Sequence, residues 1–287
     1  MASENAEQVL AAWETSSQYW NKHQALIEKM FAPLTRALIE EAQIVAGQSV
    51  LDIGGGSGEP SLTIAGVVGP SGQVTFTDPT AGMVKAAREE SERRGLGNIE
   101  FHQSAAEKLP FADNSFDVVV GRLSPMFFAD VPGALREILR VVKLGGRLAL
   151  LVWADRELNP FFTVISEVLN RFVPAEPEDE DAPAAFRFAR PGKLAKLLEE
   201  ARAVSVNERA LQFDTEAPVD ISEFWGLRTE MSDTFRTKLA KLAPDEVSAV
   251  RDAVLKAAAV YFESGSMSFP SQVLIVSGVK AVDKDNG

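Results

Sequence analysis

The sequence predicts an α/β fold in which helices cover both faces of a mostly parallel sheet. Three observations carry this prediction. Residues 50–60 read as a buried strand, a glycine turn and the start of a helix. Strand and helix patterns then alternate as far as residue 154. Finally, Val118–Val120 and Leu148–Trp153 are continuous apolar runs, which are typical of strands covered on both faces.

The first strand and its turn predict a nucleotide pocket. Gly54, Gly56 and Gly58 allow a ligand to approach the backbone closely, and Pro60 suits the first turn of a helix. A dinucleotide fingerprint requires G-x-G-x-x-G, but either count from these glycines meets Glu59 or Ser61 at the third position. P-loop and G-x-S-x-G patterns are also absent from this stretch.

Electrostatics separate this turn further from a phosphate site. Glu59 lies at the start of the helix, where a phosphate would otherwise bind, and Asp52 adds a second negative charge nearby. The pocket is therefore suited to a cation. Asp52 to Gly58 has the form D-x-G-x-G-x-G, which resembles the first motif of class I S-adenosylmethionine-dependent methyltransferases. The cofactor of these enzymes carries a sulfonium and no phosphate, which agrees with a turn that has acidic residues where a phosphate would bind.

The second strand, 73–78, ends in Asp78, whose carboxylate can accept hydrogen bonds from two ribose hydroxyls. The resemblance implies that Met83, a few residues on, packs against adenine; the alternative is a core residue at a helix start. A third strand, 98–103, leads into a segment similar to the family's G-D-A-E-x-L-P-F. Ala105 stands where the family segment has an aspartate, whose carboxylate would accept a hydrogen bond from the adenine amino group. The backbone of Ala106 can still face the adenine ring, but the amino group is left to Ser104, a water or no partner.

The fourth strand, 116–122, ends at Arg122, which binds either the cofactor carboxylate or a surface acid. Asp130 follows as an N-cap or a base for a helix at 131–142. The next segment is similar to the family's R-V-L-K-P-G-G-x-L, with Leu144 where proline is usual. These matches fall in order along the chain, and the group that it resembles is that of the quinone-biosynthetic (UbiE-like) methyltransferases.

This resemblance implies a Rossmann-like sheet of seven strands, mostly parallel with the last strand antiparallel, carrying helical cap insertions. The expected segments are an N-terminal helical lid (1–46), the cofactor-binding core (47–154), a helical cap (155–190), a core continuation (191–214), a helical cap insertion (215–265) and a final strand with the C-terminal tail (266–287). Within them we expect a helix from 160 to 172, a solvated acidic loop at 176–181, a helix at 191–203 and strands at 204–213 and 272–280.

The implied reaction is in-line transfer of a methyl group from S-adenosylmethionine to O, N or C of a small hydrophobic or aromatic molecule, leaving S-adenosylhomocysteine. Trp20 is expected to close over the cofactor, and His23, beside the lid aromatics, is the candidate base. Aromatic side chains of the caps would line the substrate pocket, namely Tyr19, Phe127, Phe128, Phe161, Phe162, Phe224 and Trp225. The alternatives are a catalytically silent relative that only binds ligands and, less favoured, an NAD-dependent oxidoreductase.

Composition narrows the partners. The 287 residues are 46% apolar, enough for one substantial core, and the net charge of −12 argues against nucleic acid. The absence of cysteine excludes disulfides and thiolate chemistry, and two histidines without H-E-x-x-H give no metal site. The longest apolar run, 148–154, is too short for a membrane span, and the N-terminus shows no signal pattern. We therefore expect a cytoplasmic monomer or homodimer.

Overall fold

The computed structural model describes residues 2–174, 179–263 and 265–282. Within them, one seven-stranded sheet has the order β3-β2-β1-β4-β5-β7-β6, in which β7 runs antiparallel to its neighbours β5 and β6. The fold class expected from the sequence is thereby confirmed. The strands are β1 (Ser49–Ile53), β2 (Gln73–Asp78), β3 (Ile99–Gln103), β4 (Phe116–Arg122), β5 (Val142–Trp153), β6 (Ala203–Ala217) and β7 (Met267–Lys280).

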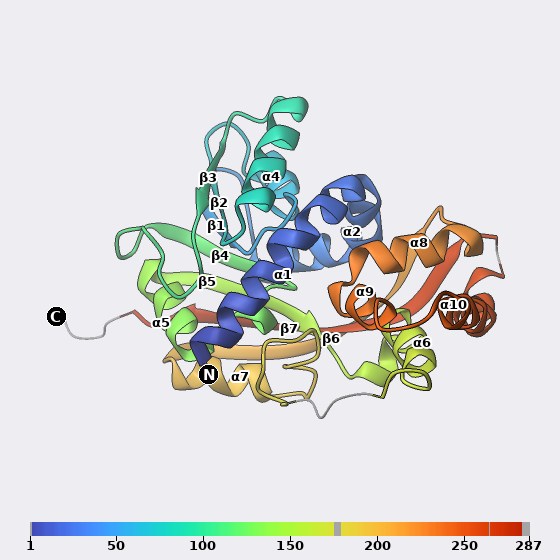
Figure 1. The fold of residues 1–287 in the computed structure, drawn as a ribbon. Coiled ribbons are helices and arrows are strands. Elements are labelled where there is room, and N and C mark those ends of the chain that lie inside the picture. Colours follow the sequence, from blue (N-terminus) through green and yellow to red (C-terminus); the bar gives the residue numbers. More distant parts are fainter. Residues whose placement is uncertain (1, 175–178, 264, 283–287) are drawn as a thin grey trace.

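Helices cover both sides of the sheet. In Figure 1, α2 and α4 lie on one side of the sheet and α5 and α7 on the other, while α1 crosses in front of it. The helices α6, α8, α9 and α10 gather at one end, beyond the long strands β6 and β7. The helices are α1 (Ala2–Lys22), α2 (Gln24–Ala42), α3 (Ser61–Val68), α4 (Ala81–Arg94), α5 (Val131–Val141), α6 (Pro160–Leu169), α7 (Lys193–Glu200), α8 (Ile221–Met231), α9 (Asp233–Leu239) and α10 (Pro244–Ala258), with short 3-10 turns η1 (Pro125–Phe127), η2 (Arg156–Leu158) and η3 (Ala259–Phe262).

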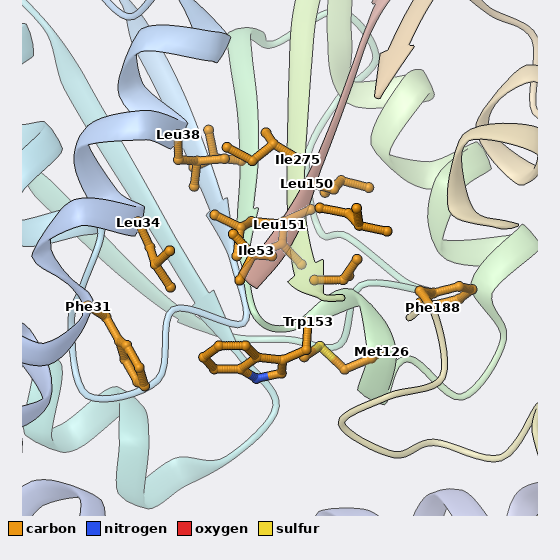
Figure 2. Close-up of a cluster of buried hydrophobic side chains, with 14 of the residues drawn as sticks. Phe31, Leu34, Leu38, Ile53, Met126, Leu150, Leu151, Trp153, Phe188 and Ile275 are labelled. Carbon is orange, nitrogen blue, oxygen red and sulfur yellow. The ribbon is translucent and has the colours of Figure 1, made fainter. Parts of the chain in front are cut away.

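The main core lies between α2 and the centre of the sheet. Phe31, Leu34 and Leu38 follow one face of α2 at helical spacing and point at strand residues that include Leu151 and Ile275 (Figure 2). These side chains are almost completely buried, and each contributes about 1.5–3 kcal/mol through removal from water. This packing holds α2 against β4, β5, β6 and β7.

Several boundaries differ from the expected ones. Asp130 caps α5 by accepting a hydrogen bond from the Gly133 N–H at 3.0 Å, as its position suggested, and the helix ends at Val141. Strand β6 continues four residues beyond Phe213, and β7 begins at Met267. The polar residues there resemble a turn in sequence, but the two strands pair throughout this extension and carry the cap helices. Of the expected acidic loop, Glu176–Glu178 lie outside the described residues, and the remainder is exposed.

Candidate active site

The loop after β1 forms a cradle from its own backbone. Gly54 and Gly56 both adopt positive φ angles, of 67° and 57°. The Gly54 N–H donates to the Thr77 carbonyl at 2.8 Å, which fastens the loop to the end of β2. A Cβ on Gly54 would lie 2.5 Å from that of Ser124, whereas a Cβ on Gly56 would project into open space. Gly58 is turned away from the cradle, because a Cβ there would meet Leu62.

Asp52 lies beneath this loop and does not line the cavity described below. It is completely buried; one of its carboxylate oxygens accepts a hydrogen bond from the Ser61 hydroxyl at 2.7 Å, and the other has no partner. Burial raises the pKa of Asp52 to about 7. The side chain therefore fixes the start of α3 from below, and its place is that of a supporting residue.

Asp78 is the central carboxylate of the cradle. It is only 6% exposed, and its two oxygens accept hydrogen bonds from the Gly56 N–H at 3.0 Å and the Thr80 N–H at 2.9 Å. Burial raises the pKa of Asp78 to about 6, so the group is ionised at neutral pH. A side-chain hydrogen bond from Thr80 also favours the charged form of Asp78, and the residue lines the cavity.

These groups surround a first cavity of about 320 Å³ at the carboxyl ends of the strands. Met83 and the segment Ser104–Ala106 line it, although the Ser104 hydroxyl already donates to the Lys108 carbonyl at 2.9 Å. Its charged lining consists of four acids and one base, namely Glu7, Glu59, Asp78, Glu107 and Arg122. This excess of carboxylates favours a cationic ligand, as the sequence indicated.

Arg122 is held within the protein. Its guanidinium donates to the Thr35 hydroxyl at 2.8 Å and to the Glu59 carbonyl at 3.1 Å. Neither partner is a surface acid, which was one of the two roles expected. Because the side chain also borders the first cavity, its other role, toward a ligand carboxylate, agrees with its position.

Helix α1, the expected lid, contributes Trp13 and Trp20 to the lining of the first cavity. Trp13 and Trp20 pack edge to face with centroids 5.4 Å apart, and Trp13 packs likewise on Phe127 at 5.1 Å. The Glu14 carboxylate accepts hydrogen bonds from the Ala81 and Gly82 N–H groups at 3.1 Å each, at the N-terminus of α4. The lid is therefore fastened next to the segment that follows Asp78.

A second cavity, of about 440 Å³, adjoins the first. Aromatic side chains dominate its lining, among them Phe161, Phe162 and Trp153. The two cavities share a wall, which consists of Val9, Trp13, Trp20, Phe31, Leu123 and Phe127. Phe128, expected in the substrate pocket, lines only the first cavity.

Besides Asp52 and Gly58, four residues expected in the site lie outside both cavities. The Tyr19 ring packs under the Arg236 guanidinium at 4.6 Å. The His23 imidazole pairs with Glu230, with Nε2 to Oε2 at 2.5 Å. Phe224 lies on the buried face of α8 and stacks on Phe269 inside the cap. Trp225 packs on Phe235.

Arg228 lines the second cavity and was not anticipated from the sequence. It follows Phe224 by four residues and so lies on the same buried face of α8. A basic residue at helical spacing on an otherwise apolar face is the signal that could have identified it. In the part of the chain that the structure describes, no group of three potential metal ligands occurs, and no helix is long and apolar enough to cross a membrane.

Comparison with known proteins agrees with this geometry. A family described as "Methyltransferase domain" matches residues 51–150. The ubiquinone/menaquinone biosynthesis C-methyltransferase UbiE of Hahella chejuensis is 41% identical over 134 residues, 46% of this chain and 53% of that protein. Its namesake in Pseudomonas fluorescens is 38% identical over 172 residues, 59% of this chain and 66% of that protein. The alignment thus spans about half the length of the first relative.

Two solved structures share the fold. The YcgJ protein of Bacillus subtilis has a TM-score of 0.55 at 21% identity, covering 86% of this chain and 98% of that one. A Haemonchus contortus phosphoethanolamine N-methyltransferase, solved with phosphomonomethylethanolamine and S-adenosylhomocysteine, has a TM-score of 0.55 at 17% identity. That match covers 92% of this chain and 58% of the other.

Proposed function

The chain belongs to the class I S-adenosylmethionine-dependent methyltransferases, and from this premise we propose that it methylates a small, largely apolar molecule held in the second cavity. The observation that carries the proposal is the wall shared by the two cavities. One cavity has the acidic lining and glycine cradle that suit the cofactor. The other has an aromatic lining and lies directly beside it.

The first cavity fits S-adenosylmethionine on several counts. Asp78 offers ionised oxygens to the two ribose hydroxyls, and Gly56 leaves open space above the cradle. Met83 provides a polarizable surface for the adenine. We assign Arg122 to the amino-acid carboxylate of the cofactor because its side chain borders this cavity, as do Ala105 and Ala106.

When bound, the cofactor supplies a methyl group on a positively charged sulfur, which an electron-rich acceptor atom can attack. The chain's own task is alignment and exclusion of water. Trp13, Trp20 and Phe127 form a continuous apolar wall where the two ligands would meet. The carboxylates of the first cavity favour the sulfonium electrostatically.

We assign no general base. The imidazole of His23 is engaged by Glu230 and lies outside both cavities, and Asp130 acts as the cap of α5. Positioning accounts for catalysis where the acceptor atom is already nucleophilic. The acceptor atom, O, N or C, and the homodimeric or monomeric state belong to the proposal as alternatives.

The test is calorimetric titration of the purified protein with S-adenosylmethionine, S-adenosylhomocysteine and NAD in parallel. The proposal expects binding of the first two and none of NAD. Binding of NAD alone would favour an oxidoreductase, and binding of none would favour a silent relative; either result would overturn the proposal.

A matched pair of variants links binding to the cradle. Gly56→Ala and Gly95→Ala both place a side chain at a positive φ in open space, but only Gly56 lines the first cavity. Their backbone strain should be similar. We expect Gly56→Ala to weaken S-adenosylhomocysteine binding by about tenfold, a cost of about 1.4 kcal/mol, and Gly95→Ala to leave it unchanged.

A further inference from the structure

Arg228 is a buried cation for which the described part of the chain provides no partner. It is only 6% exposed, on the inner face of α8. No ion pair or hydrogen bond to another described residue engages its guanidinium, and its buried Nε has no acceptor. A guanidinium has five N–H donors, and a buried charge is normally paired.

Two aromatic rings hold this guanidinium at the wall of the second cavity. Its central carbon lies 4.0 Å from the Phe161 ring centroid and 5.3 Å from that of Phe162. Such rings stabilise a cation but accept no conventional hydrogen bond in the plane of the guanidinium. The rings therefore fix its position while leaving its donors available.

Another basic residue contributes to the positive potential. Lys238 also borders the second cavity, and Asp233 is its one acidic residue among those described. The Asp233 carboxylate is already engaged by Arg236, with Nη2 to Oδ1 at 3.1 Å. The first cavity has the reverse balance, four acids and one base, in a chain whose net charge is −12.

Burial is the one influence that shifts the pKa of Arg228, which it lowers to about 9. Among the described residues, no carboxylate counteracts that shift. The guanidinium nevertheless remains charged at neutral pH, so a ligand there meets a desolvated positive charge.

We propose that Arg228 determines the specificity of the second cavity by binding the carboxylate of an acceptor whose remaining body is apolar or aromatic. This rests on the proposed function. A single negative charge matches the guanidinium of Arg228, and a planar carboxylate suits its fork of donors. Arg228 borders the second cavity alone, so the opposite end of such an acid is directed toward the shared wall and the cofactor.

The experiment compares an acid with its neutral amide. The full-length protein, saturated with S-adenosylhomocysteine, is titrated calorimetrically with 6-phenylhexanoate and with 6-phenylhexanamide at pH 7.5. These probes have the same apolar body and differ in charge. We expect the wild type to bind the acid about tenfold more tightly, as befits a hydrogen bond to a charged group.

Variants identify the residue responsible. Arg228→Met removes the charge at similar length and should abolish the preference for the acid, while Arg228→Lys should retain part of it. Arg251→Met serves as control, because Arg251 is exposed, pairs with Asp252 and lines neither cavity; it should retain the full preference. Unchanged affinity of Arg228→Met for S-adenosylhomocysteine shows that it is folded.

Three results would overturn the inference: no preference in the wild type, a full preference in Arg228→Met, or binding of neither probe to the loaded protein. Failure of the wild type to bind S-adenosylhomocysteine is a separate outcome, which would overturn the proposed function and this inference with it. The two failures are therefore distinguishable.

Discussion

Replacing Asp78 by asparagine should weaken cofactor binding strongly. The two oxygens of the aspartate have about four lone pairs, and the Gly56 N–H, the Thr80 N–H and the Thr80 side chain leave part of this accepting capacity for a ligand. A hydrogen bond to a charged group contributes about 1.5–3 kcal/mol. The substituted side chain would lack the charge and one acceptor, a loss of about 2–3 kcal/mol, which corresponds to about 30- to 150-fold in dissociation constant.

The pH dependence gives this prediction a second, independent readout. Asp78 has a pKa of about 6 because burial disfavours its charged form. As the pH falls through 6 the carboxylate takes up a proton, so wild-type affinity for S-adenosylhomocysteine should decline between pH 7.5 and pH 5. The Asp78→Asn variant cannot titrate at this position, and its affinity should decline less.

Calorimetric titrations of both proteins at the two pH values measure these effects. Asp252→Asn is the control, because that carboxylate is exposed on α10 and borders neither cavity. Asparagine must also turn an amide N–H₂ toward one of the two backbone donors, so a thermal melt is recorded in parallel. Equal affinities of Asp78→Asn and the wild type at pH 7.5 would refute the assignment of Asp78 to the ribose.

Three further predictions concern stability and the lid. Arg228→Met should raise the free energy of unfolding by about 1–4 kcal/mol at pH 7, because it removes a desolvated, unpaired charge; denaturant titration measures this, and a less stable variant contradicts it. Asp52 retains its proton up to a pKa of about 7 when folded and loses it near 3.8 when unfolded, so its contribution to stability is lost as pH rises through that window. Asp52→Asn should therefore stabilise the protein more at pH 8 than at pH 5, by about 3 kcal/mol at most, and equal melting shifts at the two pH values would count against this reasoning. Glu14→Gln weakens the caps on Ala81 and Gly82, so amide hydrogen exchange in α1 should accelerate, and unchanged protection would show that the lid is fastened elsewhere.

Local patterns in the sequence predicted several residues that border the first cavity. The glycine cradle, Asp78 and Met83 all border one cavity, because each follows closely on a strand of the parallel sheet. The carboxyl ends of such strands meet at one edge, so sequence order alone brings these residues together. The order of the strands and the antiparallel β7 likewise agree with the family resemblance.

The cap side could not be predicted in the same way. Phe161 and Phe162 border the second cavity, but Phe224, equally aromatic and equally near a cap, stacks inside the core on Phe269. Which face of α8 turns inward depends on how the helix sits on the β6–β7 extension, and that strand pairing continues through polar residues. The composition shows that the caps are aromatic, whereas the tertiary packing decides which rings border the second cavity.

The wall shared by the two cavities has a thermodynamic consequence. Trp13 and Trp20 line both cavities, so a ligand that shifts these indoles in one cavity changes the affinity of the other cavity for its own ligand. Thermodynamic linkage requires this effect to be reciprocal. If one ligand changes the dissociation constant of the other by some factor, the second ligand changes the dissociation constant of the first by the same factor. The affinity measured for one ligand alone therefore describes only one of the four binding steps in the cycle of free, singly bound and doubly bound protein.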